Sequence, residues 1–150
     1  MKILIVEDQP EKACELSNHL DILIEDELNI CVEDSLKSGL MHLISQEKPD
    51  FLVLDMSMPK FSSSNNTLDS EPASDAGKEL MKQMKIREIL VPTIVVTQYS
   101  IFEKGNVTLE KLDLEFKEEF KEFYIGSVFY NSASHDWKDK FNFLLGKIND

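Results

Sequence analysis

The sequence predicts an α/β fold in which a parallel β-sheet is covered by helices on both faces. Two apolar runs, 2–6 and 51–54, show no polar alternation, which is typical of strands buried on both sides. Segments with a helical spacing of apolar residues alternate with such runs along the chain. Strands separated by helices of this length need crossover connections, and these produce a parallel sheet.

The first half of the chain contains three expected strands and two expected helices. Pro10 suits a first helical turn, and apolar residues follow it at helical spacing: Ala13, Leu16, Leu20 and Leu23. Residues 28–32 form a short second strand. Ser35 is a residue type that caps helices, and the apolar stripe after it comprises Leu36, Leu40, Leu43 and Ile44. The third strand, 51–54, ends directly before Asp55.

The second half continues the alternation. A helix carries Leu80, Met81 and Met84 after Asp75 and Gly77. Strand 93–97 follows Pro92, and a charged helix over 108–121 has the stripe Leu109, Leu112, Phe116 and Phe120. Strand 123–130 precedes a last helix that begins near Ser134 and carries Trp137, Phe141, Leu144, Leu145 and Ile148. This order of elements is typical of the flavodoxin-like class, with helices on both faces of a five-stranded sheet.

Length and charge restrict the class of protein. The 150 residues predict a single domain, 1–150. Sixteen Lys and Arg against 28 Asp and Glu give a net charge of −12, which opposes binding to nucleic acid or to an anionic membrane. No run has transmembrane length, and Met1 leads directly into a strand, so we expect a cytoplasmic protein. Cys14 and Cys31 are expected to be buried free thiols.

One segment interrupts the pattern. Residues 60–74 are rich in Ser, Asn and Pro and almost free of large apolar side chains, so we expect a flexible insertion there. It is either a tolerated surface insertion or a lid or partner-contact loop, since it begins after Pro59, four positions beyond Asp55.

Three carboxylates follow two of the expected strands. Glu7 and Asp8 come after the first strand, and Asp55 comes after the third. The carboxyl ends of strands in an open α/β sheet are where ligands bind, and clustered carboxylates suit a hard cation. In the alternative interpretation, Asp55 caps the following turn, and the other two cap the first helix.

Three strings together resemble the receiver domain of two-component response regulators: ILIVEDQ at 3–9, KPDFLVLDMSMP at 48–59 and VPTIVVTQYS at 91–100. The resemblance covers the chain apart from the insertion and the end of the last strand. An acidic pair alone is weak evidence, but its combination with D-x-x-M-P and a hydroxyl ending the fourth strand is specific. The resemblance implies the strand order 2-1-3-4-5 and a signalling protein that is not an enzyme.

The resemblance also implies a role for each site residue. Asp55 would accept a phosphoryl group from a histidine of a sensor kinase or phosphotransfer protein. Asp8 and Asp55 would bind Mg²⁺ directly, with the backbone carbonyl of Ser57 as a further ligand and Glu7 acting through water. Thr97 would be the switch hydroxyl. Such transfer depends on positioning and on neutralising the developing charge, which a cation supplies.

Two positions depart from the receiver pattern. Gln98 stands where the family usually has a small residue. Receivers also end the last strand with a lysine, whereas this chain has Tyr130 or Asn131 there, and neither can supply a charge. Lys138 either reaches back from the last helix or is solvated. We therefore expect any modification to be poorly coupled to conformational change across 107–130.

Two functions follow. The first is a stand-alone phosphoacceptor receiver that passes its signal by protein contact on the face of the fourth helix, fifth strand and fifth helix, since no effector domain follows the last helix. The alternative is a pseudo-receiver that works as a protein-interaction module independently of phosphorylation.

Overall fold

The computed structural model describes residues 1–45, 47–61, 75–99, 101–102 and 107–149. Most of the predicted insertion, 62–74, lies outside these residues, so its role stays a prediction. Its first two residues, Lys60 and Phe61, are described and exposed.

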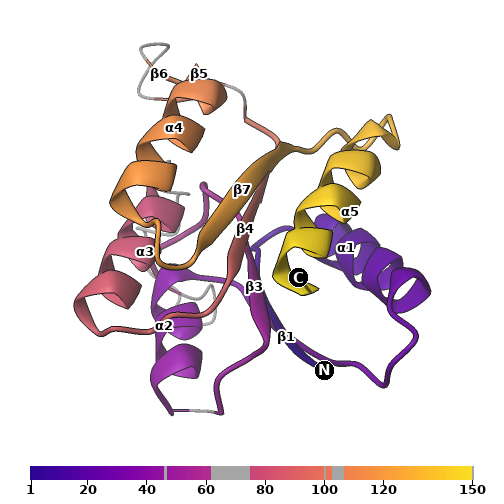
Figure 1. Ribbon diagram of the computed structural model, residues 1–150, viewed down its shortest axis with the longest axis horizontal. Coiled ribbons are helices and arrows are strands. Elements are labelled where there is room, and N and C mark those ends of the chain that lie inside the picture. The colour runs from indigo at the N-terminus through magenta and orange to yellow at the C-terminus, as the bar shows by residue number, and fades with distance from the viewer. Residues whose placement is uncertain (46, 62–74, 100, 103–106, 150) are drawn as a thin grey trace.

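The centre of the molecule is a parallel sheet of five strands, and each pairs in parallel with its neighbours in the order β2-β1-β3-β4-β7 (Figure 1). The strands are β1 (Lys2–Val6), β2 (Asn29–Glu33), β3 (Phe51–Leu54), β4 (Thr93–Thr97) and β7 (Tyr124–Phe129). Counted within this sheet, the order is 2-1-3-4-5, so the predicted fold class and topology are confirmed.

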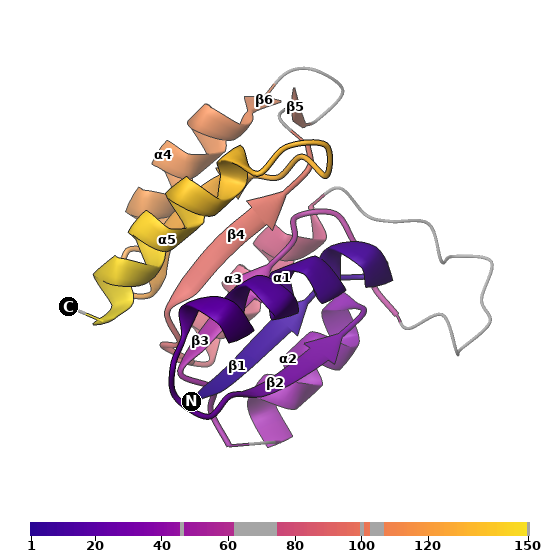
Figure 2. The same cartoon turned by 90° about the vertical axis from the view of Figure 1, so that its right-hand side faces the viewer.

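Helices cover both faces of the sheet (Figures 1 and 2). On one side lie α1 (Pro10–Leu23) and α5 (Asp136–Asn149), and on the other lie α2 (Leu36–Ser45), α3 (Ala76–Ile86) and α4 (Leu109–Glu119). Alternating strand residues supply two cores: Ile3 and Ile5 pack with α1 and α5, whereas Leu4 and Val6 pack with α2, α3 and α4. This burial on both faces explains the continuous apolar runs in the sequence.

Helix caps account for some of the boundaries. Ser35 Oγ accepts a hydrogen bond from Ser38 N at 3.1 Å, so the predicted cap of α2 is confirmed. Thr108 caps the start of α4, because its Oγ1 accepts a hydrogen bond from Lys111 N at 3.2 Å. Asp136 N donates to Ser134 Oγ at 3.1 Å, and α5 begins at Asp136, two residues later than expected.

The structure also differs from the sequence-based expectations. A short antiparallel pair, β5 (Ile101–Phe102) and β6 (Val107–Thr108), lies between β4 and α4 and was not predicted. Both cysteines are free, but Cys14 is exposed and Cys31 is half-buried, so the expected burial is wrong. Cys14 lies outside the stripe of α1 that Ala13, Leu16 and Leu20 bury. Within the residues described, no helix is long and apolar enough to cross a membrane.

Candidate functional site

Parallel pairing brings the candidate carboxylates together at one edge of the sheet. β1 and β3 are neighbours with Val6 opposite Leu54, so Glu7 and Asp55 leave their strands side by side, and Asp55 N donates to Val6 O at 3.1 Å. Carboxylate oxygens of Glu7, Asp8 and Asp55 lie within 4.8 Å of one another. Glu7 is 2% exposed and Asp55 is 3% exposed, whereas Asp8 is half-buried.

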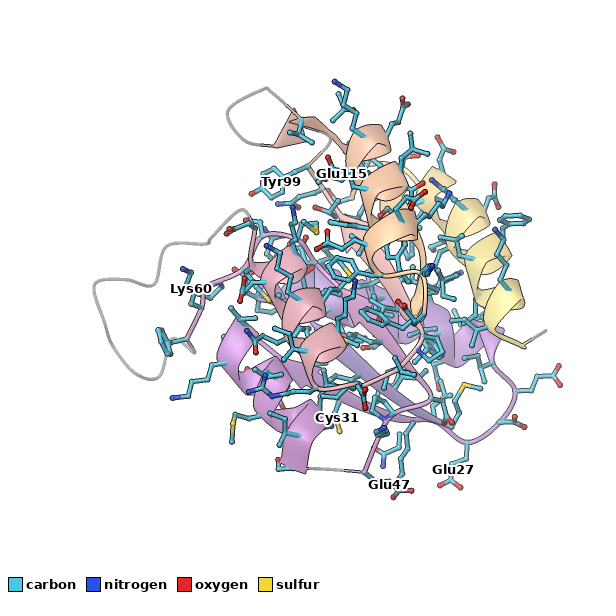
Figure 3. All side chains as sticks on the ribbon, turned by 60° about the vertical axis from the view of Figure 1, so that its left-hand side comes forward. Glu27, Cys31, Glu47, Lys60, Tyr99 and Glu115 are labelled. Atoms are coloured by element: carbon cyan, nitrogen blue, oxygen red, sulfur yellow. The ribbon has the colours of Figure 1, made fainter. Side chains whose placement is uncertain are left out.

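This edge is the carboxyl end of the whole sheet. In Figure 3, Lys60 and Tyr99 lie toward one end of the molecule, and they follow β3 and β4 in the chain. Glu27 and Glu47 lie at the other end, and they precede β2 and β3. Residues directly after the strands are therefore the ones that meet at the site.

Asp55 is a buried acceptor of the cluster. Its Oδ1 atom is buried and has no hydrogen-bond partner among the residues that the structure describes. A buried anionic oxygen without a donor is costly, so this atom fits a cation better than a structural turn. The capping interpretation is supported only at Glu7, whose Oε2 accepts from Gln9 N at 3.1 Å.

Lys12 supplies a positive charge at the centre of the site. Its Nζ atom lies 2.5 Å from Glu7 Oε1 and 3.4 Å from Asp55 Oδ2, and it donates to the backbone carbonyl of Val96 at 2.7 Å. The side chain is 2% exposed. The last strand supplies no positive charge beside Asp55, as the sequence predicted, but α1 supplies one, which was not predicted.

A sequence signal for Lys12 did exist. It lies four residues before Leu16 and eight before Leu20, and both leucines are buried on the face of α1 that packs on the sheet. Residues at i, i+4 and i+8 share one face of a helix, so a lysine in this register points inward. Pro10 places it in the first turn of α1, next to the acidic pair that precedes the helix.

Tyr130 directly follows β7, the last strand of the sheet. Its ring centroid lies 5.5 Å from Lys12 Nζ, its hydroxyl donates to Glu15 Oε2, and its backbone N donates to Thr97 O at 2.8 Å. Burial, followed by the hydrogen bond to Glu15, raises the pKa of Tyr130. Lys138 Nζ instead lies 5.7 Å from the ring centroid of Trp137, and it forms no ion pair with Asp55.

The other predicted site residues lie around this centre. Thr97 is fully buried at the end of β4, where its Oγ1 accepts from Tyr99 N at 3.3 Å. Gln98 and Ser57 are half-buried, and Ser57 lies in the bend that follows Asp55. The switch role of Thr97 and the ligand role of the Ser57 carbonyl stay predictions.

Burial controls the proton equilibria of the cluster. Desolvation, followed by the negative charge of Asp55, raises the pKa of Glu7 from 4.5 to about 8, although Lys12 opposes this shift. Burial also raises the pKa of Asp8. A divalent cation that binds these oxygens must therefore compete with protons.

Gly77 allows α3 to begin against the segment that holds Asp55. Its backbone N donates to Met56 O at 3.0 Å. A Cβ atom at position 77 would lie 2.6 Å from Asp55 O and 2.8 Å from Met56 Cα, so only glycine fits without a shift. Close backbone contact with α3 therefore holds Asp55 in position.

The chain is similar to response regulatory proteins, although no family model matches it. The Detocs response regulatory protein DtcB of Enterobacter cloacae is 30% identical over 158 residues, and the match covers 100% of this chain and 99% of that protein.

Solved receiver structures share the fold. The receiver domain of the Francisella response regulator 1452 superposes with a TM-score of 0.63 at 16% identity, covering 99% of this chain and 96% of that chain. The Mn²⁺-bound form of response regulator Rcp1 gives a TM-score of 0.61 at 16% identity, with coverages of 97% and 89%.

Proposed function

Because the chain belongs to the receiver-domain family of response regulators, we propose that it accepts a phosphoryl group on Asp55 from a histidine of a sensor kinase or phosphotransfer protein. The observation that carries this proposal is the Asp55 carboxylate, which is buried at the carboxyl end of β3 with one oxygen unpartnered among the described residues. The poor coupling expected across 107–130 was argued from the lack of a charge on the last strand, but α1 supplies a charge through Lys12. We therefore propose that modification changes the protein contacts of the chain.

The residues present also fit a divalent cation. Asp8 and Asp55 Oδ1 are the oxygens available to hold Mg²⁺ directly, because Lys12 and Gln9 N engage the two oxygens of Glu7. Glu7 would then act through water, and the Ser57 carbonyl would complete the protein ligands. Bound Mg²⁺ would neutralise charge on the transferred group. The Mn²⁺ in the Rcp1 structure supports this proposal.

Incubation with phosphoramidate and Mg²⁺ should add one phosphoryl group to the protein, as measured by intact mass. The Asp55→Asn variant should stay unmodified, because an amide oxygen is a much weaker nucleophile than a carboxylate oxygen. Asp139→Asn, an exposed change on α5, should be modified as the wild type is. A wild type that binds metal but gains no mass would instead favour the pseudo-receiver, a binding module that works without phosphorylation.

Added Mg²⁺ should raise the melting temperature, and this rise should grow as the pH increases from about 4.5 to about 8. The carboxylates must lose their protons to hold a cation, and the folded protein keeps the Glu7 proton up to about pH 8. Without metal, the melting temperature should instead fall as the pH rises from about 4.5 to about 8. Folding takes up a proton on Glu7 in this range, so the folded state loses stability as protons become scarce. Thermal melts with and without Mg²⁺ measure both trends.

Asp8→Asn should abolish the metal-dependent rise, since it removes a half-buried anionic ligand while keeping the shape of the side chain. Asp139→Asn should keep it. A wild-type melting curve that Mg²⁺ leaves unmoved at pH values near 8 would count against the metal site.

The output surface proposed here is the face of α4, β7 and α5. β7 is an edge strand between these two helices (Figure 1). Residues of α4, β7 and α5 line a groove of about 740 Å³. Leu114 and Phe129 are exposed in the groove, and its acidic residues are Glu110, Asp113 and Asp136. This chemistry suits a protein partner with apolar and basic side chains.

The free cysteines support a reducing, cytoplasmic setting.

A further inference from the structure

We propose that Lys12 is a catalytic residue of this site: its ammonium group neutralises the phosphoryl group that arrives on Asp55 and passes the change to β4 through the Val96 carbonyl. The inference rests on the proposed transfer to Asp55. It starts from the position of a single buried ammonium group.

Lys12 Nζ lies among the ends of four strands. It contacts Glu7 after β1, Asp55 after β3 and the Val96 carbonyl in β4, and it faces the ring of Tyr130 after β7. Among the residues described, no other lysine or arginine forms an ion pair with Glu7, Asp8 or Asp55. Within the described residues, Lys12 is therefore the protein cation that pairs with this cluster, through Glu7 and Asp55.

The transfer itself increases the demand for positive charge. An oxygen of Asp55 forms a bond to phosphorus, the phosphorus–nitrogen bond of the donor breaks, and the departing nitrogen keeps that electron pair and leaves protonated. The new acyl phosphate carries more negative charge than the carboxylate that it replaces. An ammonium group held 3.4 Å from Asp55 Oδ2 in a buried site is preorganised to stabilise this charge.

The same side chain connects the modification to β4. Its Nζ atom donates to the Val96 carbonyl at 2.7 Å and lies 3.4 Å from Asp55 Oδ2. Phosphoryl oxygens on Asp55 should draw the ammonium group toward them and so lengthen or break its hydrogen bond to Val96. Val96 precedes Thr97, whose carbonyl accepts from Tyr130 N, so the loss alters the place where β4 meets β7.

A purely structural Lys12 predicts a different outcome. In that case the lysine only offsets the charge of the buried carboxylates, and its removal lowers stability while the folded fraction still accepts a phosphoryl group at the normal rate. The rate of modification and the affinity for metal separate the two possibilities.

The test compares phosphorylation rates by intact mass, with phosphoramidate as donor and Mg²⁺ present. Lys12→Met should be modified about a hundredfold more slowly than the wild type. It should bind Mg²⁺ at least as tightly, because no ammonium group then competes for the carboxylates. Lys82→Met, an exposed lysine of α3, should match the wild type.

A second pair keeps the test decisive if Lys12→Met does not fold. The double variant Glu7→Gln, Lys12→Met also lacks the carboxylate that the lysine contacts most closely. It should be phosphorylated about a hundredfold more slowly than Glu7→Gln alone. If either Lys12→Met protein is modified at the rate of its parent while the wild type gains a phosphoryl group on Asp55, the role of Lys12 is overturned and the proposed function stands. An unmodified wild type overturns both.

Discussion

Replacing Lys12 with methionine should lower the free energy of unfolding by about 3–5 kcal/mol, the usual cost of leaving a buried charge without its partner. The ammonium group lies 2.5 Å from Glu7 Oε1 and 3.4 Å from Asp55 Oδ2, and all three side chains are at most 2% exposed. Methionine fills most of the volume of the lysine stem, so the change isolates the loss of charge from the loss of packing. Urea unfolding of the two proteins measures the difference.

The loss should depend on a second carboxylate and on pH. Adding Glu7→Gln to Lys12→Met should recover part of the stability, because it removes a carboxyl group that must otherwise stay protonated or be buried as an anion without a partner. The loss should also grow as the pH rises through about 8, where Glu7 of the wild type becomes an anion that only Lys12 stabilises. Lys82→Met should change stability by less than about 0.5 kcal/mol, since that lysine is exposed. Equal losses at positions 12 and 82 would contradict the buried ion pair.

Replacing Gly77 with alanine should cost about 1–3 kcal/mol of stability and slow the phosphorylation of Asp55. The added Cβ would lie 2.6 Å from Asp55 O and 2.8 Å from Met56 Cα, and backbone atoms cannot rotate away from it. Either α3 or the segment that carries the acceptor must move. Urea unfolding and the rate of phosphoryl addition by intact mass report the two consequences.

Gly146 offers a matched control in another helix. A Cβ atom there meets nothing within 4 Å, so Gly146→Ala should stabilise α5 by about 0.5–1 kcal/mol. The two glycine variants should therefore change stability in opposite directions. A Gly77→Ala protein that is as stable and as readily phosphorylated as the wild type would show that the contact between α3 and the Asp55 segment is not needed.

Much of the fold could be predicted from local pattern. Continuous apolar runs such as 2–6 and 51–54 occur where a strand is buried on both faces, and helices on both faces require parallel crossovers. The placement of carboxylates at a common edge also follows from the sequence, because parallel strands end on the same side. The hairpin of β5 and β6 could not be predicted, since two-residue strands are too short to show a periodic pattern.

Side-chain environments needed the tertiary structure. Cys14 was expected to be buried from its apolar neighbours, yet it is exposed because it lies outside the buried stripe of α1. Lys12 was overlooked because a lysine is normally solvated, and only its register with Leu16 and Leu20 indicates otherwise.

The sequence by itself determined that three carboxylates meet at the carboxyl end of a parallel sheet. It did so because the strand pattern and the position of each acid relative to its strand are both local properties. Only the tertiary structure decided which cation of the chain lies beside Asp55. That choice depends on how α1 packs across the sheet, which brings Lys12 within 2.7 Å of Val96 O, 84 residues away in the sequence. A long, flexible side chain can reach several strand ends, and the surrounding packing selects among them.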